Sequence, residues 1–402
     1  MKSGCVTKKL GEVCETFNGI WKGSKPPFRN VGVIRSTNFT KECGFDSRTE
    51  KTVFIDVEEK KFLKRKLQYG DIVVERSGGG PNQPVGRVLF FNLKDGDYTI
   101  SNFTSALRVR DNAELDSYYL YHALCAQYFS GVTAKMQGNS INIINLHYDE
   151  YLNLDIPIPP LSEQKRIVKK IDAAFEKIDA LKANAEKNLA NAKELFQSAL
   201  DEAMRPKKGW VERRLGELGE TLTGMTPSTK DKSNFGDYMP FVKPGDIAPF
   251  SQIQFRAEGL SQKGVGLSRL IKKDSVLMVC IGASIGKTGY ADRDCTCNQQ
   301  INALTPKGFS GRYLYYLLSS EKFKTKLIDE SGQTTLPIIS KSKWENLRVF
   351  VLEALDEQRE IVKRLDFLSE KIKLLDQNYT RQIADCVEMR QAILREAFEG
   401  RL

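Results

Sequence analysis

The sequence predicts two α/β (α+β) domains that alternate with two long helices, which pair as an antiparallel coiled coil. The first observation is a repeat: LSEQKRIVKKIDAAFEKIDAL from Leu161 returns as LDEQREIVKRLDFLSEKIKLL from Leu355, a constant shift of 194 residues. The second is that both stretches lack proline and glycine and carry apolar residues at helical spacing. The chain is therefore an internal, pseudo-two-fold repeat of one domain-plus-helix unit.

The length of the chain and its breaks divide it into four segments. A chain of 402 residues is too long for one ordinary core. Prolines and glycine at Pro157–Pro160 and Pro206–Gly209 interrupt regular structure. We predict domains at residues 1–157 and 208–352, and helical segments at 158–207 and 353–402.

The two domains repeat weakly at their starts and ends. VTKKLGEVCETFNG from Val6 resembles VERRLGELGETLTG from Val211, and LDSYYLYHAL from Leu115 resembles FSGRYLYYLL from Phe309. Runs rich in β-branched and aromatic residues predict strands at Thr52–Val57, Asp71–Glu75, Gly86–Phe91, Val276–Ile281 and Leu347–Val351. We expect short helices at Ser117–Tyr128 and Gly311–Lys326.

A heptad frame defines the expected coiled-coil seam. It places Ile171, Ile178, Leu365 and Ile372 at a positions, and Leu181, Asn188, Leu195, Leu375, Gln382 and Met389 at d positions. Asn188 and Gln382 are equivalent in the two copies. Two interpretations stay open: tolerated amides, or a buried amide pair that fixes the register.

Composition indicates a globular protein with a polyanionic partner. The net charge is +10, distributed as +3 over residues 1–160, +3 over 161–208, +5 over 209–354 and −1 over 355–402. The eight cysteines and two histidines lack zinc-site spacing, so we expect free thiols, a cytoplasmic location and no cofactor or metal. The segment MKSGCVTKKLGEV has no apolar run, which predicts no signal peptide.

Motifs for catalysis are weak. Gly282-Ala-Ser-Ile-Gly-Lys-Thr288 has one residue too few between its glycines for a phosphate-binding P-loop. A glycine-rich turn that presents Lys287 and Arg87 to a ligand, or a plain hairpin turn, fits better. The prolines of Ile158-Pro159-Pro160-Leu161 lack the partners of a methyltransferase loop, and Asp56, Glu58 and Glu59 have no counterpart in the second half, so we expect no catalytic residues.

Candidate DNA-binding residues are basic and amide side chains in loops. Arginine and lysine can contact guanine edges or phosphates, and asparagine and glutamine can contact adenine. In the first half the candidates are Lys25, Arg29, Arg35, Arg76, Asn82, Gln83, Arg87, Asn139 and Asn142. In the second half they are Lys230, Lys243, Arg269, Lys287, Asn298, Gln299, Gln300, Gln333 and Lys341.

Taken together, these features resemble the specificity (S) subunit of a type I restriction-modification system over essentially the whole chain. The resemblance rests on Pro159-Pro160-Leu161-Ser-Glu-Gln-Lys-Arg-Ile167 and its copy Leu355-Asp-Glu-Gln-Arg-Glu-Ile361, and on Leu10-Gly-Glu12, Leu215-Gly-Glu217, Gly70-Asp71-Ile72 and Ile285-Gly286-Lys287. The second copy departs from the family pattern with Glu353-Ala354 where prolines usually precede the motif.

The resemblance implies that each domain is a target-recognition domain for one half of a split, asymmetric site in double-stranded DNA. It also implies that the helices space the two domains and dock two methyltransferase (M) subunits, with restriction (R) subunits completing the complex. The half-sites of such a protein lie about one helical turn apart. Two alternatives stay open: a DNA-modifying or DNA-cleaving enzyme in its own right, and a coiled-coil scaffold.

Overall fold

The computed structural model describes residues 5–48, 51–80, 83–140, 143–248, 253–256, 258–332 and 337–401. The chain divides into two compact units, one of Met1–Asn184 with Gln382–Leu402 and the other of Ala185–Arg381. Each unit thus combines one globular domain with part of both long helices. The division into four segments stays a prediction.

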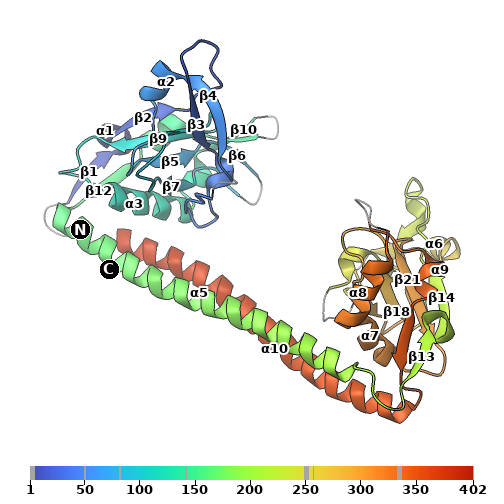
Figure 1. The fold of residues 1–402 in the computed structure, drawn as a ribbon. Helices are drawn as coiled ribbons and strands as arrows, with labels where there is room; N and C mark the ends of the chain where they lie inside the picture. The colour runs from blue at the N-terminus through green and yellow to red at the C-terminus, as the bar shows by residue number, and fades with distance from the viewer. Residues whose placement is uncertain are drawn as a thin grey trace. The chain divides into compact units, whose positions relative to one another are not determined.

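The domain of the first unit is built on four small sheets (Figure 1). The main sheet has the order β2 (Cys14–Asn18), β9 (Thr104–Val109), β5 (Ile72–Glu75), β7 (Val88–Phe90) and is antiparallel. The other sheets are β4 (Val53–Glu58), β3 (Phe28–Ile34), β8 (Tyr98–Ile100); β10 (Gln137–Ser140), β11 (Ile143–Leu146), β6 (Ser77–Gly79); and β1 (Val6–Lys9), β12 (Asp155–Ile158). The strands expected at Thr52–Val57, Asp71–Glu75 and Gly86–Phe91 correspond to β4, β5 and β7.

One helix covers the main sheet of this domain and connects it to the long helices. It is α3 (Ser117–Phe129), close to the predicted Ser117–Tyr128, and its N-cap Asp116 accepts hydrogen bonds from two backbone amides. Its buried residues Tyr119 and Leu120 share one apolar cluster with Ile171 and Leu394 of the long helices. The remaining helices are short: α1 (Leu10–Val13), η1 (Ser36–Asn38), α2 (Glu59–Leu63), η3 (Thr133–Lys135) and α4 (Tyr148–Leu152).

The domain of the second unit repeats this plan, with two-residue strands in two of its small sheets. Its main sheet has the order β14 (Gly219–Thr223), β21 (Ile301–Pro306), β18 (Val276–Val279), β19 (Thr288–Tyr290). The small sheets are β13 (Val211–Arg214) with β22 (Arg348–Val351), β15 (Phe235–Gly236) with β17 (Gly259–Leu260), and β16 (Phe241–Val242) with β20 (Thr296–Cys297). The predicted strands Val276–Ile281 and Leu347–Val351 correspond to β18 and β22.

The single helix predicted at Gly311–Lys326 is wrong, because the chain forms two helices there. They are α7 (Gly311–Ser319) and α8 (Glu321–Glu330). Ser320 between them has extended backbone angles, and its hydroxyl accepts a hydrogen bond from the Phe323 amide, as an N-cap does. The other helices of this domain are η4 (Leu215–Glu217), η5 (Lys232–Asn234), η6 (Pro244–Asp246), α6 (Gln262–Gly266) and α9 (Lys341–Glu345).

The two repeated stretches form the long helices α5 (Leu161–Ala203) and α10 (Leu355–Phe398) (Figure 1). Pro206 follows the end of α5 and disfavours helical backbone at the residue before it. Gly400, with a φ of +78°, follows α10, and the Arg401 amide donates to the Glu396 carbonyl in a glycine-capped end. In the described part of the chain, no helix is both long and apolar enough to span a membrane.

Ion pairs show that the long helices run antiparallel. In the first unit Arg390 of α10 pairs with Asp179 of α5, and in the second unit Lys193 of α5 pairs with Asp376 of α10 at 2.9 Å. From 179 to 193 the step along α5 is 14 residues, and from 390 to 376 the step along α10 is 14 residues in the opposite direction. The two helices therefore keep one constant antiparallel register, as the sequence predicts.

The a positions of the predicted seam are correct, and the d positions are displaced by one residue along the helix. Ile171, Ile178, Leu365 and Ile372 are buried. The predicted d residues lie outside the seam: Leu181, Leu195, Leu375 and Met389 are 55%, 59%, 38% and 47% exposed, and Asn188 and Gln382 are exposed as well. The second set of seam residues stands four residues after the a positions rather than three. It includes the partly buried Phe175 and Leu189 and the buried Phe196.

This shift also corrects the interpretation of the two amides. Asn188 and Gln382 are exposed side chains, so they do not form a buried amide pair that fixes the register. The charged pairs Arg390–Asp179 and Lys193–Asp376 lie between the helices instead.

Each long helix begins at a joint held by a buried glutamine. The side chain of Gln164 accepts from the Asp116 amide at 2.8 Å and donates to the carbonyls of Glu114 and Pro159. The equivalent Gln358 accepts from the Ser310 amide at 2.9 Å and donates to the Leu352 carbonyl. Both glutamines are fully buried, so the repeated L-x-E-Q motif ties the cap of a domain helix to the start of a long helix.

Candidate nucleic-acid interface

In the first domain, polar side chains gather where β2 and β5 end and β9 begins. The carbonyl oxygen of the Asn18 side chain accepts from the Ser105 hydroxyl at 2.9 Å and from the Arg76 guanidinium at 3.1 Å. The guanidinium carbon of Arg76 lies 4.3 Å from the centre of the Tyr148 ring. Stacking and hydrogen bonding hold this arginine in place while its side chain stays partly exposed. We call Asn18, Arg76 and Ser105 the first polar cluster.

A second layer of this cluster comes from the β6–β11 sheet. The Ser77 hydroxyl donates to the Asn145 side-chain oxygen at 2.5 Å. The backbone carbonyl of Arg76 accepts from the Leu146 amide at 2.8 Å, so β11 lies directly beside the cluster. The predicted Asn139 is in β10 of the same sheet. Asn82 and Asn142 lie outside the described residues.

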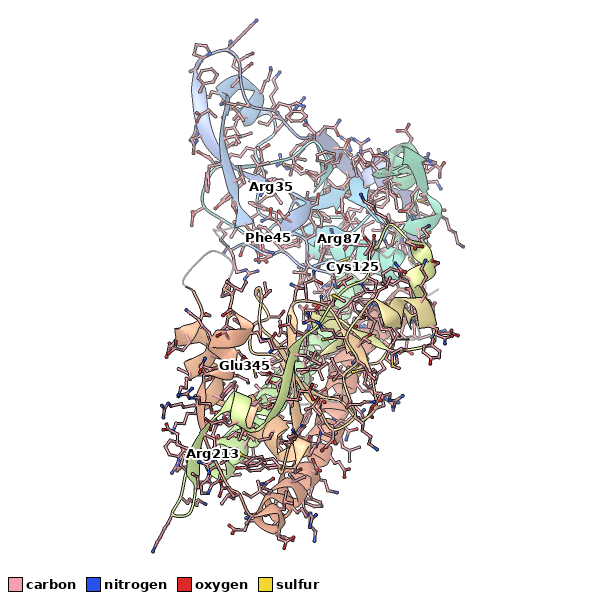
Figure 2. All side chains as sticks on the ribbon, turned by 90° about the vertical axis from the view of Figure 1, so that its right-hand side faces the viewer. Arg35, Phe45, Arg87, Cys125, Arg213 and Glu345 are labelled. Carbon is pink, nitrogen blue, oxygen red and sulfur yellow. The ribbon has the colours of Figure 1, made fainter. Side chains whose placement is uncertain are left out.

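Arg87 is not a surface residue, and its assignment as a DNA-contacting side chain was wrong. It comes from the segment before β7 (Figure 2) and forms two hydrogen bonds of 2.7 Å with Glu75. Both side chains are buried, at 6% and 1% exposure. Gln83, with its amide oxygen turned toward the guanidinium, lies 2.7 Å from Nη2 of Arg87. Arg87 therefore belongs to the interior of the domain, and a base edge cannot reach it.

The other basic residues predicted to bind DNA in the first domain differ in whether protein groups already bind them. Arg29 pairs with Asp97 at 2.7 Å, and hydrogen bonds from Lys66 and then from Arg29 keep the pKa of the Asp97 carboxyl below its ordinary value. Arg35, which follows β3 (Figure 2), reaches the Lys51 carbonyl at 3.5 Å. Lys25 is exposed and has no hydrogen bond or ion pair to the described residues.

In the second domain, several of the predicted DNA-binding residues lie around the segment 223–226. Arg269 donates to the Thr223 carbonyl at 2.8 Å, and the Thr226 hydroxyl donates to the Gln299 side chain at 2.6 Å. Asn298 donates through its amide to Gln300 at 3.0 Å. The exposed Lys243 follows β16, whose last residue Val242 accepts from the Asn298 amide at 3.1 Å. We call Arg269, Asn298, Gln299, Gln300 and Lys243 the second polar cluster.

Three other predicted residues of this domain do not join the cluster. Lys341 pairs with Glu345 one helical turn away, at 2.7 Å. Lys287 lines a cavity of about 210 Å³ next to Phe196 of α5 and Tyr316 of α7. Lys230 is exposed on the loop that follows β14, and Gln333 lies outside the described residues.

The two clusters occupy equivalent strand ends. The last rung between β2 and β9 pairs Asn18 with Ser105, and the last rung between β14 and β21 pairs Thr223 with Asn302. In each domain these side chains are hydrogen bonded across the rung. Asn18 and Thr223 were missed in the sequence, although they hold the same place in the two opening motifs, each directly before a glycine.

That glycine is required by the close approach of two backbone segments. A Cβ on Gly19 would lie 2.3 Å from the backbone of Ser101, and a Cβ on Gly224 would lie 2.2 Å from the Asn298 carbonyl oxygen. Only glycine allows such contacts without a shift of the backbone. In the first domain the loop after β2 thus packs against the segment before β9. In the second domain the loop after β14 packs against the segment before β21 in the same way.

The chemistry of both clusters suits the binding of phosphates and base edges. Guanidinium, ammonium and amide groups can donate to phosphates and base edges. Burial raises the pKa of the Cys295 thiol to about 12, so it stays protonated. Within the described residues, no group of three or more histidine, cysteine or acidic side chains could hold a metal ion.

These features define a class of protein: two recognition domains of one plan, with different polar clusters, joined to antiparallel helices. The family model "Type I restriction modification DNA specificity domain" matches residues 2–191 and 207–383. The chain therefore belongs to this family, and it carries the domain twice.

Similar proteins agree with this assignment. The chain is 30% identical over 171 residues to the type I restriction enzyme MjaIX specificity subunit of Methanocaldococcus jannaschii, covering 41% of this chain and 39% of that protein. It is 24% identical over 318 residues to the type I restriction enzyme EcoBI specificity subunit of Escherichia coli, covering 71% and 65%. The matched stretches thus span less than two thirds of the length of either relative.

Solved structures share the fold. A chain from work on complex assembly and conformational transition of the type I R-M system superposes with a TM-score of 0.75 and 22% identity, covering 100% of this chain and 99% of that one. The HsdS subunit from Thermoanaerobacter tengcongensis gives a TM-score of 0.53 at 22% identity, with coverage of 100% and 98%.

Proposed function

We propose that the chain is the DNA-binding specificity subunit of a type I restriction-modification complex and is itself non-catalytic. Each domain reads one half of a split, asymmetric target in double-stranded DNA. The paired helices set the spacing and dock two methyltransferase subunits, and restriction subunits complete the assembly. Such a complex works in the cytoplasm.

One observation carries this proposal. Equivalent strand ends of the two family domains hold different donor sets: an arginine stacked on Tyr148 with Asn18 in the first, and Arg269 with three amide side chains in the second. Different donors at equivalent places recognise different bases. Two unlike half-sites follow from that difference.

The test is to co-express the chain with its methyltransferase subunit and to map methylated adenines across a genome. Arg76→Ala should relax one half of the split motif, and Arg269→Ala the other, each by about 1–3 kcal/mol of discrimination at the contacted base. Lys341→Ala is the control, because this lysine is paired with Glu345 outside the second polar cluster. The proposal fails if both arginine variants leave the motif unchanged.

Two other functions give different results in the same system. Methylation or cleavage of DNA by the purified chain alone would identify an enzyme. If replacing residues 1–155 with the corresponding domain of a relative leaves the motif unchanged, the chain is a scaffold. Deleting seven residues from one long helix should change the preferred spacer or abolish assembly, because a heptad moves the joint by two turns.

A further inference from the structure

Two large aromatic side chains are exposed beside the first polar cluster. Trp21, three residues after Asn18, is 77% exposed, and Phe103, two residues before Ser105, is 49% exposed. Among the described residues, neither ring contacts another aromatic ring or a cation. A pair of exposed apolar side chains of this size at a binding site indicates a surface that a partner covers.

Backbone hydrogen bonds fix the position of Phe103 and identify its counterpart in the second domain. Its carbonyl accepts from the Arg76 amide at 2.8 Å, just as the Gln300 carbonyl accepts from the Cys280 amide at 2.8 Å. Both residues stand two places before the residue of the last rung of their sheet. Phe103 therefore holds the place of an amide of the second polar cluster.

Trp21 likewise holds the place of Thr226 in the second domain. Each stands two residues after the glycine that packs against the opposite segment, which for Gly19 is the backbone of Ser101. The Thr226 hydroxyl donates to Gln299 at 2.6 Å. Two places that carry hydrogen-bonding side chains in the second domain thus carry exposed aromatic rings in the first.

These rings and their surroundings specify the chemistry of the partner. A phenylalanine ring has neither donor nor acceptor, so it cannot form the hydrogen bonds by which amides read base edges, and the one apolar group that base pairs present in the major groove is the 5-methyl of thymine. The exposed Lys22 and Lys25 lie in the same segment as Trp21, and Arg76 lies beside Phe103. Because these cations attract a polyanion, they favour DNA over an apolar protein surface as the partner.

We propose that Phe103 packs against the 5-methyl group of a thymine in the half-site of the first domain, with Trp21 covering the same base pair. The second domain reads its base at the equivalent places through amide hydrogen bonds. This inference rests on the proposed function and names one feature of the DNA that the first domain recognises. Phe103 is then a specificity-determining residue that forms no hydrogen bond with a base.

The experiment measures the binding of target DNA by the full chain co-purified with its methyltransferase subunit, at one fixed salt concentration. The target is the mapped split motif, and the half-site of the first domain is the half that Arg76→Ala relaxes. Each thymine of that half-site is replaced in turn by deoxyuridine, which keeps the base pairing and lacks only the methyl group. One replacement should weaken wild-type binding about fourfold, the contribution of one buried methyl group.

Two variants show whether this effect passes through Phe103. Both Phe103→Ala and Phe103→Gln, which places the side chain of the second domain here, should bind thymine and deoxyuridine targets equally. Both should still lose affinity when the second half-site is altered, which shows that they are folded. Tyr69→Ala is the matched control, because the 57% exposed Tyr69 precedes β5 whereas Arg76 follows it. This control should keep the fourfold difference.

The possible outcomes separate the inference from the proposed function. If deoxyuridine has no effect at any thymine of the first half-site, or that half-site contains no thymine, the inference is overturned and the proposed function stands. A ring that inserts between base pairs or covers a protein surface would give this result. A fourfold loss that persists in both Phe103 variants also overturns the inference, because another residue then contacts the methyl group. A wild-type complex that binds no split target overturns the proposed function as well.

Discussion

At the first joint, His122 of α3 lies 3.7 Å from Asp172 of α5, whereas at the second the equivalent Tyr316 of α7 donates a hydrogen bond to Asp366 of α10. The second arrangement is well satisfied, because Arg312 also donates to Asp366 at 2.8 Å. In the first, neither ring nitrogen of the buried His122 has a hydrogen-bond partner among the described residues. The same joint thus tolerates two arrangements, of which only one contains a buried imidazole.

The same contrast extends into the domains. The first domain buries a complete ion pair between Arg87 and Glu75, whereas Lys287, at the corresponding place of the second, borders a cavity. One fold therefore accommodates a charged interior in one copy and a partly open one in the other. We expect the loss of a buried polar partner to cost more in the first unit than in the second, and the following variants test that difference.

The largest effect is expected from Arg87→Met. This variant leaves the Glu75 carboxylate buried without its partner, which costs about 3–5 kcal/mol of unfolding free energy. Lys287→Met, the matched change in the second domain, should cost less than about 1 kcal/mol. Chemical denaturation measures both, and equal losses would contradict the contrast between the two domains.

Next in size are the two buried glutamines. Gln164→Leu removes three hydrogen bonds to the backbone and Gln358→Leu removes two, which at about 1 kcal/mol each gives losses of about 3 and 2 kcal/mol. Thermal unfolding should rank them in that order. Gln197→Leu is the control, because among the described residues this glutamine bonds only to Asp201 on its own helix. A reversed ranking would show that the joints are not held by these bonds alone.

The smallest effect is a dependence on pH. Burial lowers the pKa of His122 below the ordinary value of 6.5, and Asp172 offsets this only in part. The unfolded chain takes up a proton at this residue at a higher pH than the folded chain does. The stability present above pH 6.5 therefore falls as the pH is lowered, by at most about 1.4 kcal/mol per pH unit. His122→Phe should flatten this slope between pH 6.5 and 5, measured by denaturation at each pH.

A control for the pH effect is available at the second joint. Tyr316→Phe removes the hydrogen bond to Asp366 but adds and removes no group that titrates between pH 5 and 6.5. It should lower stability by the same amount at every pH in that range. Because Tyr316→Phe keeps His122, it should also keep the slope of the wild type. A slope as flat as that of His122→Phe would rule out the histidine as the cause.

The elements were largely predictable from the sequence, and the contacts between them were not. Helix ends and strand runs follow from local signals, such as Pro206 after α5 and the apolar run Val276–Val279. The second set of seam residues was misplaced because apolar residues stand at both three and four residues after some of the buried ones. Leu195 and Phe196 follow the buried Ala192 in this way, and only the position of the partner helix selects Phe196.

The candidate site shows the same limit. Arg269, Asn298, Gln299 and Gln300 were identified because loops rich in basic and amide residues indicate a polar surface. The burial of Arg87 was not predictable, because its partner Glu75 is 12 residues away on the neighbouring strand β5. Asn18 was missed because a single asparagine before a glycine is a common turn signal.

The register of the long helices has a consequence for how chains meet one another in a cell. Lys193 faces Asp376, which is equivalent to Lys182, and Arg390 faces Asp179, which is equivalent to Lys373. If two chains exchanged helices so that α5 paired with α5, Lys193 would face Lys182. If α10 paired with α10, Arg390 would face Lys373. Like charges thus penalise both mismatched partnerships and favour the pairing of α5 with α10.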